Sequence, residues 1–236
     1  MSNPYFKFKQ FTVWHDKCAM KVGTDGVLLG AWTPVESAHR ILDIGTGTGL
    51  VALMLAQRSL PDANIVALEI DEAAVGQARE NIIRSPWKER VEVVQADFKK
   101  YRSSDKFDVI VSNPPYFVDS LECPDRQRAA ARHNDSLTYE DLLEGVSGLL
   151  AEDGFFTMVI PADVAERVKK IAYMRKLYAV RQLNVITKPG GIPKRVLITF
   201  SFSNQECIVE ELLTELARHQ YSEEYMTLTR DYYLNM

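Results

Sequence analysis

A short run of glycines and threonines joins an apolar stretch of the chain to a helical one. The run Gly45-Thr46-Gly47-Thr48-Gly49 follows Arg40–Ile44 and precedes Leu50–Gln57. Because glycine has no Cβ atom, such a loop can turn tightly and bring its backbone close to a ligand. In an open α/β sheet the first turn between a strand and a helix lies at the carboxyl edge of the strands, where ligands bind. The loop is therefore a candidate ligand site.

The spacing of the glycines argues against a dinucleotide. The G-x-G-x-x-G fingerprint needs a third glycine five positions after the first, but position 50 is Leu. Asp43, just before the loop, is badly placed beside a pyrophosphate and well placed near the amino group of a zwitterionic ligand. A cationic sulfonium cofactor with a methionine tail fits this local charge.

Acidic side chains also stand at the ends of the next two predicted strands. Glu69 ends one of them, where a carboxylate can accept both hydroxyls of a ribose. Asp97 and Phe98 follow the other, where the acid can accept a hydrogen bond from an adenine amino group while the ring packs on the purine. Asp71 is more simply the N-cap of the next helix. The repetition of acids favours a nucleoside-bearing ligand over unrelated turn residues.

A second motif, Asn113-Pro114-Pro115-Tyr116, follows the apolar stretch 107–112. Two prolines fix two φ angles and remove two backbone donors, which leaves carbonyl oxygens free to face a ligand. Two acceptors, the Asn113 side chain and the Pro114 carbonyl, can hold the hydrogens of an amino group on a planar ring or amide while Tyr116 stacks on it. Catalysis would then come from orientation and preorganised dipoles, without a strong base.

Alternating apolar strands and helical patterns position these motifs and predict a doubly wound α/β fold with a mostly parallel sheet. We expect seven strands, at 40–44, 64–68, 91–95, 107–112, 154–160, 180–185 and 196–202. Helices are expected at 50–57, 72–83, 139–150, 162–176 and 209–218. The prolines and glycines of Lys188–Lys194 predict an antiparallel edge hairpin with a long loop.

The rest of the chain is interpreted as part of a single domain, with an extension over residues 1–34 packed on a core of 35–236. The extension contains a strand-like stretch, 6–14, and a helical one, 25–32, which Asp25 can cap. In the short C-terminal tail, Tyr225, Tyr232 and Tyr233 are expected to pack rather than to stack on bases.

Composition excludes several classes of protein. The chain has 236 residues, a net charge of −4 and three distant cysteines, so a uniformly basic nucleic-acid-binding surface, a disulfide framework and a zinc site are not expected. Neither a secretory signal nor a bilayer-spanning apolar run is visible in the sequence. We expect a cytoplasmic protein without a metal or a membrane partner, and a monomer rather than an oligomer.

Together the glycine loop, the three acids and the Asn-Pro-Pro-Tyr motif resemble the Rossmann-like class I methyltransferases over residues 40 to 202. The resemblance implies S-adenosylmethionine as cofactor, with Asp43, Gly45 and Gly47 around its methionine part, Glu69 at the ribose, and Asp97 with Phe98 at the adenine. The expected cofactor residues are Thr24, Asp25, Asp43, Gly45, Thr46, Gly47, Gly49, Glu69, Ile70, Asp97, Phe98 and Asn113. The expected catalytic residues are Asn113, Pro114, Pro115 and Tyr116.

Three further segments, 11–15, 20–32 and 225–234, resemble the bacterial tRNA1(Val) adenine-N6-methyltransferases, which act on the anticodon-loop adenine at position 37. This resemblance implies a tRNA substrate, held at its anticodon stem-loop. The expected substrate-binding residues are Lys188, Lys194, Arg195, Arg128, Arg132 and His133, although His133 can equally be a packing or capping residue. Thr24 and Asp25 can shape a lid of the cofactor pocket or simply cap a helix.

Two alternatives remain open on the sequence alone. The Asn-Pro-Pro-Tyr motif also occurs in glutamine-N5 methyltransferases that act on protein release factors, but those enzymes carry a separate helical N-terminal domain, whereas this chain has only a short extension. The other alternative is a catalytically silent RNA- or nucleotide-binding module, against which the intact Asp43, Glu69, Asp97 and Asn113 argue.

Overall fold

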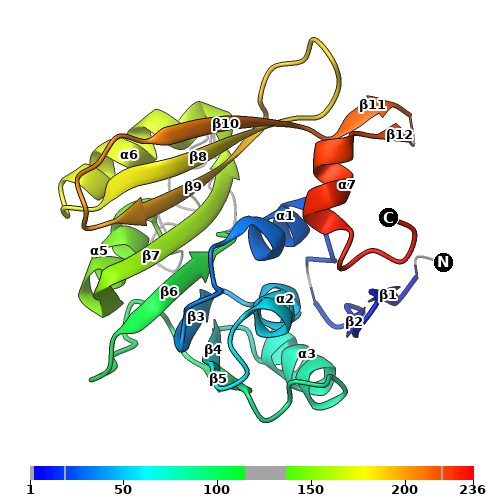
Figure 1. The fold of residues 1–236 in the computed structure, drawn as a ribbon. Coiled ribbons are helices and arrows are strands. Elements are labelled where there is room, and N and C mark those ends of the chain that lie inside the picture. Colours follow the sequence, from blue (N-terminus) through cyan, green and yellow to red (C-terminus); the bar gives the residue numbers. More distant parts are fainter. Residues whose placement is uncertain (1–2, 19, 115–136, 219) are drawn as a thin grey trace, which may run out of the picture.

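A central sheet of eight strands organises the fold in this computed structural model, which describes residues 3–18, 20–114, 137–218 and 220–236 (Figure 1). The strand order is β10-β8-β9-β7-β6-β3-β4-β5. The strands are β3 (Arg40–Ile44), β4 (Asn64–Glu69), β5 (Val91–Gln95), β6 (Phe107–Ser112), β7 (Leu150–Pro161), β8 (Tyr178–Ile186), β9 (Arg195–Ser201) and β10 (Ile208–Leu213). Among these strands, β9 is antiparallel to both of its neighbours, and the other pairings are parallel.

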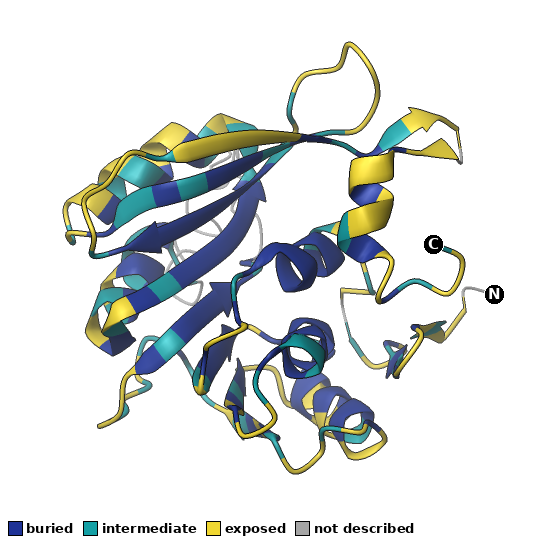
Figure 2. Ribbon diagram, in the orientation of Figure 1, coloured by how far each residue is buried: buried dark blue, intermediate teal, exposed yellow. Residues whose placement is uncertain are grey.

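Helices cover both faces of the sheet. They are α1 (Thr24–Trp32), α2 (Leu50–Arg58), α3 (Glu72–Ile83), α5 (Tyr139–Leu149), α6 (Ala165–Tyr173, after the 3₁₀ turn Ala162–Val164) and α7 (Glu223–Thr229). Two hydrophobic cores result, and the strands divide their side chains between them with a period of two. Along β3, Ile41 packs with α1, α2 and α3, whereas Leu42 and Ile44 pack with α5 and α6. The central strands are therefore buried on both sides (Figure 2).

The predicted helix over 209–218 is wrong, because this segment forms β10 and then β11 (Glu215–Ala217). Strand β10 pairs in parallel with β8, from Ile208 opposite Arg181 to Leu213 opposite Ile186. The Nε atom of Arg181 also lies 2.8 Å from Oε2 of Glu210. Helix propensity of Glu and Leu is a weak preference, and the backbone edge of β8 offers hydrogen bonds that override it.

This strand also changes the predicted sheet. The structure has eight strands in the main sheet instead of seven. The expected antiparallel pairing of β8 with β9 is present, but the pair is not an edge hairpin, because β10 covers the outer side of β8. The other seven strands and four of the five predicted helices lie where the sequence pattern placed them, within a few residues.

The predicted N-terminal strand 6–14 is a hairpin of two short strands, β1 (Tyr5–Lys7) and β2 (Thr12–Trp14). The C-terminal tail packs against it, since the backbone N–H of Lys9 donates to the carbonyl of Tyr232 at 2.8 Å. Tyr225 and Tyr232 are buried, and the hydroxyl of Tyr232 donates to the Met54 carbonyl at 3.3 Å. The expected packing role of these two tyrosines is confirmed. The N-terminal hairpin lies beside α3 and the C-terminal helix α7 lies beside α1, and the two ends of the chain are close to each other (Figure 1).

Helix α1 begins one residue earlier than predicted, and the predicted cap is wrong. Gly23 is the N-cap residue, and its extended backbone leads into the helix without a side-chain cap. Asp25 instead lies in the first turn. A carboxylate there still interacts favourably with the positive end of the helix dipole. No helix in the described part of the chain is long and apolar enough to span a bilayer.

Helices α1 and α2 pack closely at Gly30, so a single added methyl group there should destabilise the protein. A Cβ atom on Gly30 would lie 2.7 Å from Cβ of Met54, so we expect Gly30→Ala to lower the free energy of unfolding, by about 1–3 kcal/mol. Gly76 on α3 is a matched control with no atom within 4 Å of a new Cβ; Gly76→Ala should raise stability by about 0.5–1 kcal/mol. Urea unfolding of both variants checks this, and equal stabilities would contradict the close packing.

Candidate active site

The glycine loop after β3 has left-handed backbone at three positions. The φ angles of Gly45, Gly47 and Gly49 are +72°, +55° and +82°. A Cβ atom built on Gly45 or Gly47 would meet nothing within 4 Å, so these two backbones face open space. Gly49 differs, because its Cβ would contact Ala78 and Ile82 of α3 at 3.6 Å, and it lines neither of the cavities described below. Of the predicted glycines, two face the site and one packs against a helix.

Asp43 is buried at the end of β3, with 1% of its surface exposed. Its Oδ2 accepts hydrogen bonds from the Thr46 hydroxyl at 2.6 Å and from the Ala52 backbone N–H at 3.2 Å. Among the described residues Oδ1 has no hydrogen-bond partner, and Asp43 lines a cavity. Burial raises the pKa of Asp43 to about 7, against the opposing effect of the two hydrogen bonds. A cationic group placed beside Oδ1 would favour the ionised carboxylate.

Glu69, at the end of β4, ties the glycine loop to the neighbouring strand. Its Oε2 accepts from the Gly47 N–H at 2.9 Å, and its Oε1 accepts from the N–H groups of Ile70 and Asp71 at 2.8 and 3.0 Å. The carboxylate is thus fixed before any ligand arrives. The side chain of Asp71 accepts from the Ala74 N–H at 2.8 Å, which confirms its predicted role as a helix cap.

A cavity of about 340 Å³ lies beside the loop and has mostly apolar walls. Phe98 lines it from one side and its ring is backed by α5, since a Cβ on Gly145 would lie 2.5 Å from the Phe98 ring. Glu69 and Asp97 add carboxylates to the same lining, and Oδ1 of Asp97 accepts from the Lys99 N–H at 3.0 Å. Apolar walls with a few fixed acceptors are typical of a nucleoside site.

A second cavity of about 360 Å³ adjoins the first. It is lined by Asp43, residues 45–48 of the loop, and the start of α1 with Thr24 and Asp25. The two cavities share four residues, from the segment before α1, the glycine loop and the segment after β6: Met20, Gly45, Gly47 and Asn113. They are therefore two ends of one site, with Asn113 where they meet.

Asn113 and Pro114 reach this site because β6 lies next to β3 in the sheet. Ser112, the last residue of β6, donates its hydroxyl to the Ile44 carbonyl at 3.0 Å, so the two strand ends are held together. Pro114 lines the second cavity beside the loop. The other predicted residues of this region lie outside the described part of the chain: Pro115, Tyr116, Arg128, Arg132 and His133.

The first residue of β9, directly after the basic loop between β8 and β9, contacts α1. The Nε atom of Arg195 donates to Oδ2 of Asp25 at 3.0 Å, so a predicted substrate-binding residue is paired with a predicted cofactor-binding one. Lys194 is exposed beside it, and Lys188 is exposed further along the same loop.

Some residues that line the site were not predicted from the sequence. Cys18 and Met20 come from the irregular segment before α1, and Leu137 from the segment before α5. Burial, with the charges of Glu69 and Asp71, raises the pKa of the Cys18 thiol to about 11. Among the described residues there is no cluster of three His, Cys, Asp or Glu side chains that could hold a metal.

Residues 21–184 match the family described as methyltransferase small domain. Curated relatives align over the whole chain. One from Bacteroides thetaiotaomicron is 77% identical over 100% of both chains, and one from Phocaeicola vulgatus is 55% identical, also over 100% of both. One from Yersinia enterocolitica is 44% identical over 98% of this chain and 92% of its own. All three are named tRNA1(Val) (adenine(37)-N6)-methyltransferase.

Solved structures share the fold. A predicted O-methyltransferase from Agrobacterium tumefaciens has a TM-score of 0.70 at 19% identity, covering 90% of this chain and 100% of its own. A putative RNA methyltransferase from Pyrococcus horikoshii has a TM-score of 0.56 at 16% identity, covering 76% and 82%. At such identities the likeness concerns the fold alone, and it confirms the predicted class I methyltransferase architecture. The chain belongs to the methyltransferase small domain family and to the family of tRNA1(Val) (adenine(37)-N6)-methyltransferases.

Proposed function

We propose that the protein transfers a methyl group from S-adenosylmethionine to N6 of adenine 37 in the anticodon loop of tRNA1(Val). The names of relatives between 44% and 77% identical over nearly the whole chain support this substrate. The observation that carries the reaction is the position of Asn113, at the junction of the two cavities beside the glycine loop. The same position argues against a silent binding module, and the names of the relatives favour a tRNA over a protein release factor as the substrate.

The residues that line the two cavities fit S-adenosylmethionine at both of its ends. Glu69, Asp97 and Phe98 would hold the ribose and the adenine in the first cavity, where fixed acceptors and an aromatic ring meet. Oδ1 of Asp43 and the open backbones of Gly45 and Gly47 would receive the amino acid part. When bound, S-adenosylmethionine supplies an electrophilic methyl group on a sulfonium.

Asn113 and Pro114 would act on the acceptor nitrogen. The lone pair of an exocyclic amine is delocalised into the adenine ring, so the nitrogen is a poor nucleophile. Carbonyl oxygens of Asn113 and Pro114 would accept its two hydrogens and hold the lone pair toward the cofactor end of the site. Because the backbone that carries both groups follows the hydrogen-bonded ends of β3 and β6, the gain would come from orientation and preorganised dipoles. Pro115 and Tyr116 complete the proposed catalytic set.

An adenine in a single-stranded loop can reach this site at modest unstacking cost. Lys188, Lys194 and Arg195 would contact the phosphates of the RNA, as would Arg128 and Arg132, with His133 near the bound nucleotide. Thr24 and Asp25 are proposed to border both the cofactor and the RNA, since the ion pair with Arg195 links them to the basic loop.

Methyl transfer with labelled S-adenosylmethionine tests the function directly. The protein is incubated with unmodified bulk tRNA and, separately, with protein release factors, and the labelled product is mapped. We expect N6-methyladenosine at position 37 of tRNA1(Val). Label on glutamine, label on another tRNA nucleotide, or tight cofactor binding without transfer would overturn the proposal.

Asn113→Ala should strongly slow methyl transfer without weakening the binding of S-adenosylmethionine. Loss of a positioned hydrogen-bond acceptor is expected to lower kcat by about 10²–10³-fold, while the Kd for S-adenosylmethionine stays close to that of the wild type. The control is Asn64→Ala, at the opposite end of β4, where the side chain is exposed and binds only the nearby Asp62 carbonyl. Kinetics and calorimetry check both variants. A comparable loss of cofactor affinity in Asn113→Ala would show that Asn113 serves cofactor binding instead.

Two glycines of α5 offer a test of the adenine end. A Cβ on Gly145 would push the Phe98 ring, whereas a Cβ on Gly148 would meet no atom within 4 Å. We expect Gly145→Ala to raise the Kd for S-adenosylmethionine by roughly tenfold, about 1.4 kcal/mol, and Gly148→Ala to leave it unchanged. Calorimetric titration measures both. Equal affinities of the two variants would place Phe98 outside the cofactor site.

A further inference from the structure

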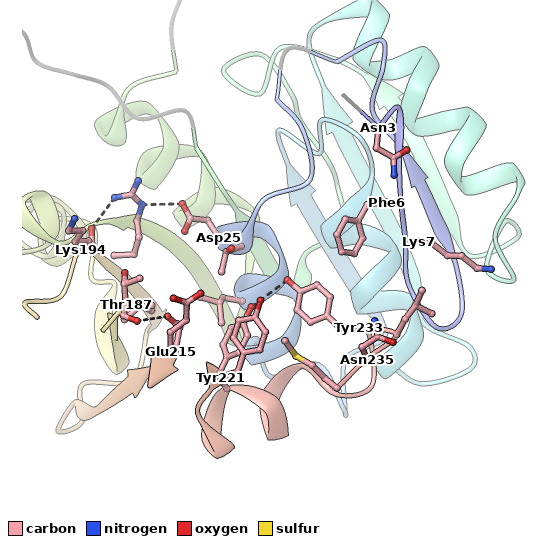
Figure 3. A pocket seen from close by; sticks show the side chains of 18 of the residues that line it. Asn3, Phe6, Lys7, Asp25, Thr187, Lys194, Glu215, Tyr221, Tyr233 and Asn235 are labelled. Carbon is pink, nitrogen blue, oxygen red and sulfur yellow. Dashed lines mark hydrogen bonds and ion pairs between the residues drawn. The ribbon is translucent and has the colours of Figure 1, made fainter. Parts of the chain in front are cut away.

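A third cavity, of about 820 Å³, borders the start of α1, and neither Asn113 nor the glycine loop lines it (Figure 3). Its walls come from the N-terminal hairpin, the β8–β9 region, the β11–β12 hairpin (β12, Gln220–Tyr221) and the C-terminal tail. The volume lies within the range of about 300–1,000 Å³ that is usual for ligand pockets. We call it the tail cavity.

The tail cavity borders the active site. Thr24 and Asp25 line both the tail cavity and the cavity that contains Asn113 and Pro114. Arg195, bound to Asp25 at 3.0 Å, lines the tail cavity from the other side of the ion pair. A ligand longer than one nucleotide that enters the active site over the start of α1 can therefore extend into the tail cavity.

Aromatic rings form one wall of the tail cavity. Tyr221 is 36% exposed, and its ring centroid lies 5.3 Å from that of the buried Tyr225. Tyr233 follows at 6.5 Å from Tyr225, and Phe6 lies 5.8 Å from Tyr233. Tyr221 is thus an accessible ring backed by a packed aromatic row. Nucleobases bind proteins by stacking on rings of this kind.

Charged and hydrogen-bonding side chains line the same cavity, and they include the carboxylates of Asp25, which is paired with Arg195, and of Glu215, which lies opposite Tyr221 in the β11–β12 pairing. Lys7 and Lys194 line the cavity, and in the described part of the chain neither forms an ion pair. Figure 3 shows Lys194 on the side of Asp25 and Thr187, and Lys7 across the opening beside the N-terminal hairpin. Lysines on two walls suit the phosphates of a polynucleotide. The amides of Asn3 and Asn235 add donors and acceptors for a base edge.

The walls are held by contacts within the protein. The Nζ atom of Lys9 donates to the carbonyls of Arg230 and Met236 at 2.5 and 2.9 Å, which joins the N-terminal hairpin to the tail. The hydroxyl of Ser222 donates to the Leu213 carbonyl at 2.5 Å, which fixes the segment next to Tyr221. A cavity whose walls are already in place loses little entropy when it binds a ligand.

We infer that the tail cavity binds a second nucleotide of the substrate RNA, one that flanks the target adenine, with its base stacked on Tyr221 and its phosphate near Lys194. This inference rests on the proposed function. It assigns the N- and C-terminal segments a part in substrate binding, apart from catalysis. An acidic peptide would use the lysines but would leave the exposed ring without a planar partner, so single-stranded RNA fits the lining better.

The test uses the full chain and a synthetic unmodified anticodon stem-loop RNA. Versions of this RNA carry the fluorescent base 2-aminopurine on the 5′ or the 3′ side of the target adenine. The variants are Tyr221→Ala and the conservative Tyr221→Phe. Tyr173→Ala is the matched control, because Tyr173 is 65% exposed on α6 and does not line the tail cavity. RNA affinity, quenching of the probe, methyl transfer and cofactor affinity are measured for each.

In the wild type we expect one of the flanking probes to be quenched by stacking. Tyr221→Ala should reverse the quenching and raise the RNA Kd by roughly tenfold, with the Kd for S-adenosylmethionine unchanged. Tyr221→Phe should keep the wild-type signal, and Tyr173→Ala should behave as the wild type. A fold disturbed by Tyr221→Ala would instead change Tyr221→Phe or the cofactor affinity.

The same measurements separate a wrong nucleotide site in the tail cavity from a wrong proposed methyl transfer. If the wild type methylates the RNA while neither probe is quenched, or while Tyr221→Ala binds the RNA as tightly as the wild type, the tail cavity is not a nucleotide site and the proposed function stands. If the wild type neither binds nor methylates this RNA or bulk tRNA, the proposed function and the proposed nucleotide site are both wrong. Competition of an acidic peptide, but not of single-stranded RNA, for the cavity would also overturn the inference.

Discussion

The buried carboxylate of Asp43 is the interaction on which the rest of the site depends. It lies at the end of a central strand and holds the glycine loop through Thr46 and the start of α2 through the Ala52 N–H. Glu69, at the end of the neighbouring strand, also holds the glycine loop, because it accepts a hydrogen bond from the Gly47 N–H. A charged group in such a place is costly unless it is hydrogen-bonded and meets a charge partner. The raised pKa of Asp43 is a consequence of this unfavourable burial of the charge.

Strand order converts this local arrangement into a reaction site. Because β3 pairs in parallel with β4 on one side and with β6 on the other, the ends of three strands place Asp43, Glu69 and Asn113 at one edge of the sheet. Helix α1 then closes that edge, and its first turn borders both the active site and the tail cavity. The extension before the core is in this way part of the site, since Asp25 lines both the active site and the tail cavity.

Much of this was predictable from local patterns. Strands buried on both faces, a glycine loop out of register for a dinucleotide, and acids at strand ends are signals contained in short windows of sequence. Errors arose where distant segments decide the structure. The stretch over 209–218 has helical composition, yet the edge of β8 makes it a strand. The Asp25–Arg195 pair joins residues 170 positions apart, and no short window contains it. Cys18 and Met20 lie in irregular backbone, which carries no periodic signal.

The most direct test of the claim that the Asp43 carboxylate receives the amino group of S-adenosylmethionine is the pH dependence of cofactor affinity. The useful range is between about pH 5.5 and 7.5, where the ligand's amino group stays mostly protonated. Burial places the pKa of Asp43 at about 7, so acidification removes the charge that would face that amino group. We predict that the affinity of the wild type falls as pH drops below 7, by at most about tenfold per pH unit, and that Asp43→Asn, checked for folding by urea unfolding, binds weakly with a flat profile. A flat profile in the wild type, or the same slope in Asp43→Asn, would contradict the role of Asp43.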